Sequence, residues 1–278
     1  MMSDRFKGAL VDTMLIGSIV LLLLFFYAPI ATLVAFSFSS SRVLSLPMEG
    51  FSFNWYGELL AKPDFLPAVT NSAAVAAVST VFATALGTAG AVAWIRYRFR
   101  LQRAFQVVTF APLLFPQLLL GVVMLLWFSV LGNWLNFSTG LVTVIIGHIV
   151  YITPFALVIV AVQVFGFDDT LEDAARDAGA NGWQVFREVT LPLLWPGIFS
   201  AAIFAFLLSW GNFYVSYSLA GTARTLPIFV YSGIAVGSSP IYPALATLNL
   251  VPALLLVGFA EFMRRRALKR QSAAVPTA

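Results

Sequence analysis

The stretch that decides the fold is residues 104–167, which read AFQVVTF APLLFPQLLL GVVMLLWFSV LGNWLNFSTG LVTVIIGHIV YITPFALVIV AVQVFGF. It contains no Asp, Glu, Lys or Arg, and it is far longer than the roughly 20 apolar residues with which one helix crosses a bilayer. Residues 132–140 divide it, because glycine and asparagine at this density are typical of a turn. The stretch therefore predicts two membrane-spanning helices, at about 105–131 and 141–165.

The composition of the whole chain also indicates a membrane protein. Hydrophobic residues make up 60% of the 278 residues and charged residues only 10%, whereas a soluble domain carries about 25% charged residues. So few charges cannot cover a water-facing surface. Near the N-terminus the uncharged run lasts from Thr13 to Ser41, which is longer than the roughly 7–15 apolar residues of a cleavable signal peptide. It predicts an uncleaved membrane span.

The same reasoning along the chain predicts an all-α integral membrane protein with a single transmembrane domain over 1–278. Of its 16 lysines and arginines, all but Arg42, Lys62 and Arg224 fall on one side of six spans. The positive-inside rule then places both termini in the cytoplasm, and the even number of spans agrees with this orientation. The predicted spans are about 13–36, 68–95, 105–131, 141–165, 193–219 and 242–263.

The longest predicted cytoplasmic segment, residues 168–192, has its own helix signals. Thr170 followed by Asp173 has the form of a capping box, and Gly179 supplies a stop. On this helix the small apolar residues share one side, which suits insertion into a groove on a partner, and the charged residues occupy the other. A second short helix at 183–189 is expected along the membrane surface, and Leu191-Pro192 is expected to turn the chain into the next span. On spacing alone, an ordinary amphipathic loop between two spans is the alternative. The two sides are Leu171, Ala174, Ala175 and Ala178, and Glu172, Asp173, Arg176 and Asp177.

One pattern in this segment matches a known family. Residues 173–192 resemble the EAA loop of type I ABC importer permeases. The matching pattern is Asp173-Ala174-Ala175, three residues, Gly179, nine residues, Val189, one residue, and Leu191-Pro192. Asp173 stands where the family usually has Glu, and Val189 where it usually has Ile. The resemblance covers nearly the whole chain, and looser matches at 53–56, 71–72 and 225–228 are similar to the spermidine/putrescine-type subgroup.

The resemblance implies a set of partners and a coupling site. A dimer of separate ABC ATPase subunits, which bind ATP and Mg, would grip the loop. A second, different permease would complete the pathway in a bacterial inner membrane, and an extracytoplasmic binding protein would deliver the solute. The residues expected to couple to the ATPase are Glu172, Asp173, Ala174, Ala175, Ala178, Gly179, Leu191 and Pro192.

The solute path is expected to involve the polar residues inside spans, since such groups usually face the bundle interior or a cavity. The candidates are His148, Ser209, Asn212 and Tyr214, and interhelical hydrogen bonding is the alternative role for His148 and Asn212. Polyamine permeases commonly carry acidic residues where this chain has 209–214 (SWGNFY). These neutral residues argue against a polyamine and favour a zwitterionic or neutral solute, or an organic cation held by aromatic rings. The resemblance to the spermidine/putrescine-type subgroup keeps a polyamine or related amine among the expected cargoes.

Several function classes are excluded by what the sequence lacks. There is no cysteine and only one histidine, so disulfides and histidine metal clusters within the chain are excluded. No Walker A motif occurs, so ATP hydrolysis is expected on a partner and not on this chain, and no nucleic-acid module is present. Apart from Asp12 and Glu261 near their ends, the spans lack carboxylates. This absence argues against an ion-coupled secondary carrier and against an intramembrane enzyme.

Overall fold

The computed structural model describes the backbone of residues 2–45, 47–237 and 239–274. Every named element in these residues is a helix, and Ser39 and Phe51 form an isolated antiparallel β-bridge. Six helical segments of the described chain are long and apolar enough to cross a membrane, so the predicted number of spans is confirmed. These segments are Val11–Phe36, Phe65–Arg96, Gln117–Leu135, Leu141–Phe165, Gly182–Trp210 and Ile241–Phe259.

The chain divides into two compact units, and the predicted single domain over 1–278 stays a prediction. The first unit comprises Met1–Lys62 and Ser232–Leu254, and the second comprises Pro63–Tyr231 and Leu255–Ala278. In the first unit, α1 (Met2–Phe36) leads to α2 (Asn54–Leu60). The connection between them is held by the Trp55 indole, which donates a hydrogen bond to the Ser39 carbonyl at 2.5 Å. Part of α12 (Ile241–Ala274) belongs to the same unit.

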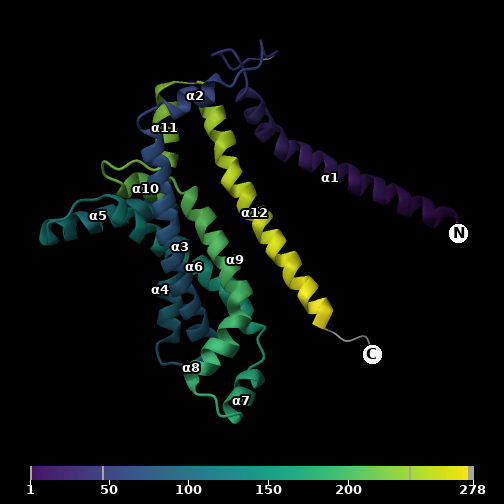
Figure 1. Cartoon of the computed structure of the whole chain (residues 1–278), viewed down its shortest axis with the longest axis vertical. Coiled ribbons are helices and arrows are strands. Elements are labelled where there is room, and N and C mark those ends of the chain that lie inside the picture. The colour runs from purple at the N-terminus through teal and green to yellow at the C-terminus, as the bar shows by residue number, and fades with distance from the viewer. Residues whose placement is uncertain (1, 46, 238, 275–278) are drawn as a thin grey trace. The chain divides into compact units, whose positions relative to one another are not determined.

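Three long helices form the core of the second unit: α3 (Phe65–Arg96), α6 (Leu141–Phe165) and α9 (Leu191–Trp210) run side by side (Figure 1). Small residues permit this packing, as is usual between membrane helices. A Cβ atom added at Gly87 of α3 would lie 2.8 Å from the backbone nitrogen of Leu157 in α6. On α9, the small side chains of Ala201 and Ala205 are fully buried and likewise permit close packing. The core therefore depends on close backbone approach more than on large side chains.

The third predicted span, 105–131, is not one helix. It is divided into α4 (Gln102–Leu114) and α5 (Gln117–Leu135), with Phe115 and Pro116 extended between them at ψ 135°. The physical reason is local: proline disfavours helical backbone in the residue before it and has no N–H for a helical hydrogen bond. Of the two helices, α5 is long enough to cross a membrane.

The fifth predicted span, 193–219, differs at both ends. It stops as α9 at Trp210, and α10 (Tyr214–Leu219) follows after a short non-helical break. At its start, the expected turn at Leu191-Pro192 is wrong. Helix α8 (Gly182–Val185), the π-helical turn η1 (Phe186–Thr190) and α9 form one continuous helical segment. The Leu191 N–H bonds to the Phe186 carbonyl, and Pro192, which has no N–H to donate, follows directly after this π-helical turn.

A further apolar helix, α11 (Leu226–Val236), lies in what the sequence suggested was a loop. Its start is fixed by the Leu226 N–H, which donates to the Ser72 hydroxyl at 2.7 Å. Next to it, Arg224 pairs with Asp64 at 2.5 Å. These contacts hold the beginning of α11 against the beginning of α3.

Candidate functional site

The short helix predicted in the segment 168–192 is confirmed as α7 (Thr170–Asp177). The predicted capping box is wrong, because Thr170 is the first helical residue. The N-cap residue is Asp169, whose side chain makes no cap hydrogen bond; Asp168, one residue earlier, accepts from the Thr170 N–H through its Oδ1 at 3.0 Å. Hydrogen bonds from the backbone and side chain of Thr170 lower the pKa of Asp168. The negative charge at the helix start is therefore retained, where the helix dipole favours it.

The end of α7 depends on the backbone of Gly179. Its φ is +90°, a region in which an L-residue with a Cβ atom is strained. The Gly179 N–H bonds to the Arg176 carbonyl at 2.9 Å, and the Ala180 N–H bonds to the Ala175 carbonyl at 3.0 Å. These two bonds make a Schellman motif. The glycine predicted as the stop is thus confirmed as the stop.

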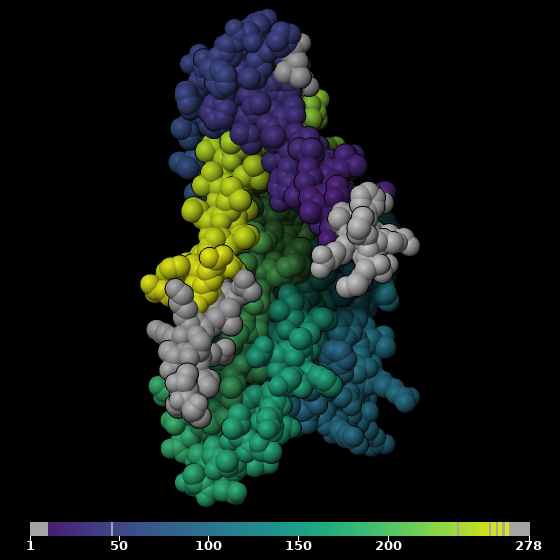
Figure 2. Space-filling view, turned by 90° about the vertical axis from the view of Figure 1, so that its right-hand side faces the viewer, coloured from purple at the N-terminus to yellow at the C-terminus, as the bar shows by residue number. Residues whose placement is uncertain are grey.

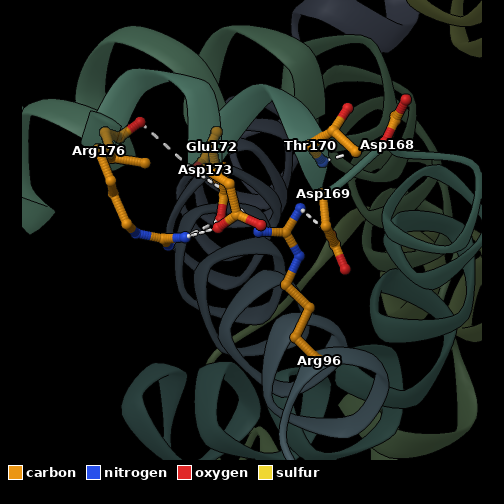
Figure 3. Close-up of polar contacts among 9 residues, drawn as sticks. Arg96, Asp168, Asp169, Thr170, Glu172, Asp173 and Arg176 are labelled. Atoms are coloured by element: carbon orange, nitrogen blue, oxygen red, sulfur yellow. Dashed lines mark hydrogen bonds and ion pairs between the residues drawn. The ribbon is translucent and has the colours of Figure 1, made fainter. Parts of the chain in front are cut away.

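Glu172 does not lie on the outer face of α7 as the sequence indicated. It is 7% exposed, and all the other residues of α7 are more exposed. Arg96, the last residue of α3, and Thr190, the last residue of η1, both donate hydrogen bonds to its Oε1. Arg176 donates to Oε2 at 3.2 Å and forms an i,i+4 ion pair with Glu172. Figure 3 shows the guanidinium of Arg96 reaching the carboxylate from below the helix.

Arg96 is itself held by two further groups. Its Nη2 lies 3.4 Å from Asp169 Oδ1, and its Cζ lies 4.3 Å from the centroid of the Phe167 ring. The Arg96 side chain is only 12% exposed. From the sequence, this arginine counted only as an orientation signal. No sequence pattern could reveal its carboxylate partner, because 76 residues separate Arg96 from Glu172.

The charge state of Glu172 follows from these contacts. Burial by itself raises the pKa of the Glu172 carboxyl, but hydrogen bonds from Thr190 and Arg96, together with the positive charges of Arg96 and Arg176, lower it below its ordinary value. Glu172 is therefore a carboxylate at neutral pH. A buried carboxylate with donors on both oxygens is the form in which such a charge is tolerated.

The opposite side of α7 carries the predicted apolar face, and it is uncovered. Leu171 is 49% exposed, Ala174 and Ala178 are exposed, and Ala175 is half-buried. Asp173 is also exposed and pairs with Arg176 at 2.6 Å. This set of residues, Leu171, Asp173, Ala174 and Ala178, is called the outer face of α7 below. In Figure 2 the segment 168–192 forms the lower end of the surface.

Beyond Gly179, two aromatic rings extend this surface. Trp183 and Phe186 are 67% and 42% exposed, and their rings stack with centroids 5.7 Å apart. Asn181 begins α8 with a capping box, because its Oδ1 accepts from the Gln184 N–H at 3.0 Å and the Gln184 Oε1 accepts from the Asn181 N–H at 2.8 Å. Leu191 and Pro192 begin α9 on the same continuous helical segment.

Of the residues expected on the solute path, the structure brings His148 and Ser209 together. The His148 ring is 1% exposed, with Nδ1 2.7 Å from the Ser209 hydroxyl and Nε2 3.0 Å from the Ser216 hydroxyl. This contact ties α6 to α9 and α10. Asn212 is also buried, and its Oδ1 accepts from the Val215 N–H at 3.1 Å at the start of α10. Tyr214 is 46% exposed.

Tyr214 belongs to a group of rings that the sequence did not reveal. Phe213 lies 5.4 Å from Tyr214, 5.2 Å from Tyr217 and 4.8 Å from Tyr231 between ring centroids. Tyr217 and Tyr231 are 54% and 50% exposed. These four residues are called the aromatic cluster below. The spacing of 213, 214 and 217 gave a partial signal, but Tyr231 joins them from α11, a helix the sequence did not predict.

A bundle of membrane-spanning helices with an exposed small-residue helix outside its spans is the arrangement expected of a transport permease that binds a partner. The family model described as "Binding-protein-dependent transport system inner membrane component" matches residues 83–269. The chain belongs to this family: it is a multi-pass inner-membrane permease component of an ABC transporter, a non-catalytic transport subunit.

Two curated relatives cover most of the chain. The putrescine transport system permease protein PotI of Escherichia coli (strain K12) is 36% identical over 261 residues, which are 91% of this chain and 92% of the relative. The spermidine/putrescine transport system permease protein PotC of the same strain is 34% identical over 242 residues, 87% of this chain and 90% of the relative.

Solved structures share the fold at lower identity. A chain of a bacterial ABC transporter involved in the import of the acidic polysaccharide alginate has a TM-score of 0.75 at 22% identity, and the match covers 95% of this chain and 98% of that chain. A chain of the MetNI methionine ABC transporter has a TM-score of 0.60 at 21% identity, covering 78% of this chain and 99% of that chain. The six-span architecture is therefore that of ABC importer permeases.

Proposed function

We propose that this permease subunit is driven by a separate ATPase that grips the outer face of α7. The observation that carries this proposal is the division of α7 into a buried, hydrogen-bonded Glu172 and an uncovered face of small residues. Small side chains let another backbone approach closely, and Leu171 and the Trp183 ring offer apolar area next to them. Asp173, Ala174, Ala175, Ala178 and Gly179 form or terminate this surface.

The same loop can pass a displacement into the membrane. Leu191 and Pro192 lie on the continuous segment Gly182–Trp210, so the end of the coupling loop and the span α9 are one helical body. A displacement of α7 reaches this segment through the short connection 178–181 and through the hydrogen bond from Thr190 to Glu172. Nucleotide chemistry belongs to the partner: ATP and Mg bind to the ATPase dimer.

The remaining partners follow from the family and its relatives. One solved relative with this fold is an alginate transporter in complex with a periplasmic protein, and the family itself is named for binding-protein-dependent transport. We infer that an extracytoplasmic binding protein delivers the solute, that a second and different permease completes the pathway, and that both termini and α7 lie in the cytoplasm.

For the cargo we propose an amine cation of the polyamine class. The relatives PotI and PotC are named for putrescine and spermidine. The aromatic cluster supplies ring faces, which attract ammonium groups with about 0.5–2 kcal/mol each. It adjoins the break between α9 and α10, and irregular backbone at membrane depth is tolerated where it is buried in protein or lines a cavity. On this proposal Tyr214 contacts the cargo, and His148, Ser209 and Asn212 hold the helices behind it.

The test is reconstitution of the complete transporter in liposomes with its ATPase, second permease and binding protein. We expect putrescine or spermidine to stimulate ATP hydrolysis and to enter the liposomes only when ATP is present. Ala174→Arg on the outer face of α7 should abolish the stimulation. Amine uptake by this chain without an ATPase would refute the coupling proposal, and stimulation by other solutes but not by amines would refute the cargo proposal.

A further inference from the structure

Glu172 is the point at which α7 is attached to the rest of the second unit. The structure describes every residue of α7, and among them Glu172 is the one that is buried. No apolar side chain of α7 is therefore buried against the rest of the unit. At its C-terminal end α7 continues through Gly179 and Gly182, which have open space around them. Apolar packing therefore cannot fix the orientation of α7, and the contacts of one carboxylate must do so.

The carboxylate is held from two separate segments. Arg96 comes from the end of α3, Thr190 from the π-helical turn before α9, and both donate to the same oxygen of Glu172. An oxygen that accepts two hydrogen bonds tolerates little movement of either donor, because hydrogen bonds weaken steeply when their distance or angle changes. If α7 slid relative to either segment, at least one of the two bonds would break. The three elements are thus joined at a single atom.

We propose that Arg96 and Thr190 are positioning residues, which hold Glu172 so that α7, the end of α3 and the start of α9 move as one body when the ATPase displaces α7. The inference rests on the coupling role proposed above, and it adds a second route into the membrane. Displacement of α7 reaches α3 through Arg96 as well as α9 through Thr190. Because α3 and α9 both pack on α6, the two routes act on one core.

The chemistry of Arg96 suits this task better than that of a lysine. Its planar guanidinium meets the Glu172 carboxylate through Nη1 and the Asp169 carboxylate through Nη2, while its face lies on the Phe167 ring. An ammonium group is a point charge without a fork or a flat face, so it cannot make all three contacts at once. Arg96→Lys should therefore retain the charge but lose part of the coupling.

The first experiment measures whether α7 and α3 move together. The chain has no cysteine, so it can be spin-labelled at Tyr97→Cys, which is 63% exposed, and at the exposed Asp177→Cys before it is assembled with its partners, without background labelling of its own. In the complete transporter we expect the same interspin distance in the nucleotide-free and ATP-bound states. Adding Glu172→Gln should broaden or shift that distance. A distance that changes between states with Glu172 intact, or one that Glu172→Gln leaves unaltered, would overturn the proposal.

The second experiment tests the pair by a double-mutant cycle. Arg96→Gln and Glu172→Gln alone should each lower solute-stimulated ATP hydrolysis about tenfold, within the usual range of coupling between sites, while the variants still assemble with the ATPase. The double variant should lose no more stimulation than either single variant, because both substitutions remove the same contact, whereas two independent folding defects would add. Arg98→Gln, at an exposed position two residues after Arg96, is the matched control and should keep full stimulation.

The outcomes separate this inference from the proposed function. If Ala174→Arg abolishes stimulation but the Arg96 and Glu172 variants keep it, α7 couples to the ATPase and the positioning role is wrong. If Ala174→Arg also leaves stimulation intact, the coupling role itself is wrong. Losses of stimulation that add up in the double variant would likewise overturn the positioning role.

Discussion

Arg96 and Glu172 lie 76 residues apart in the chain, and in the fold the guanidinium of one donates directly to the carboxylate of the other. Their side chains are 12% and 9% exposed. Removal of one partner from such a pair leaves the other charged, buried and unpaired, which is more costly than the pair is favourable. The contact therefore makes α7 sensitive to changes at a residue outside its own loop.

Loss of this contact should lower stability. We expect Glu172→Ala to reduce the free energy of unfolding by about 3 kcal/mol, because Arg96 and the Thr190 hydroxyl both lose their acceptor. The thermal midpoint of the purified protein in detergent is the measurement. Glu188→Ala, at an exposed position in η1, is the matched control. Equal midpoints for the two variants would contradict the burial of Glu172.

The pKa of Glu172 gives a pH dependence of defined sign. Its folded-state pKa lies below the ordinary value of 4.5, so the carboxylate contributes stability that is fully present above pH 4.5 and is lost as the pH falls through the folded-state pKa. The difference in thermal midpoint between wild type and Glu172→Gln should be constant from neutral pH down to about pH 4.5. At lower pH the difference should shrink. A difference that shrinks at higher pH would show that the pKa is not lowered.

Substitution by alanine should have different effects at Gly179 and at Gly182. Gly179 has φ +90°, and a Cβ atom there would meet no neighbour within 4 Å, so any cost of Gly179→Ala is backbone strain of roughly 1–2 kcal/mol. Gly182 has open space and no left-handed backbone. We expect Gly179→Ala to lower solute-stimulated ATP hydrolysis while membrane insertion is normal, and Gly182→Ala to retain it. The opposite order would remove the Schellman motif from the coupling mechanism.

Close packing of α3 on α6 gives a prediction about the membrane core. A methyl group at Gly87 would lie 2.7 Å from the Ala156 Cβ and 2.8 Å from the Leu157 nitrogen, and backbone cannot yield cheaply. Gly87→Ala should therefore cost about 1–3 kcal/mol, the usual range for overpacking. Gly17→Ala in α1 meets nothing within 4 Å and should be neutral. Resistance to thermal aggregation in detergent would rank the two variants.

Removal of a ring from the aromatic cluster should weaken amine transport. Tyr231→Leu is expected to raise the amine concentration needed for half-maximal ATPase stimulation about fivefold, the equivalent of one cation–π contact. Tyr231→Phe keeps the ring face and should behave as wild type. Tyr27→Leu changes a tyrosine on α1 that is 61% exposed and serves as control. An equal response to amines in the leucine and wild-type proteins would remove the cluster from the cargo path.

The sequence by itself determined the number of spans and the existence of α7. Both are local properties: a helix in lipid satisfies its own backbone hydrogen bonds, so an apolar run of sufficient length is enough, and the Gly179 stop lies within the same few residues as the helix it ends. The division of the third span at Pro116 was also locally encoded, since proline acts on the residue before it. It was missed because the whole run is uniformly apolar.

The tertiary structure alone decided which way α7 faces and which residues meet beneath it. Helical spacing placed Glu172 with the other charged residues on an outer side, and nothing within α7 itself contradicts that. Arg96 and Thr190 reverse it by bringing two donors from outside α7 to one oxygen. Tyr231 likewise reaches Phe213 from a different helix. Periodicity reports which residues share a face, but the direction of that face is set by whatever packs against it.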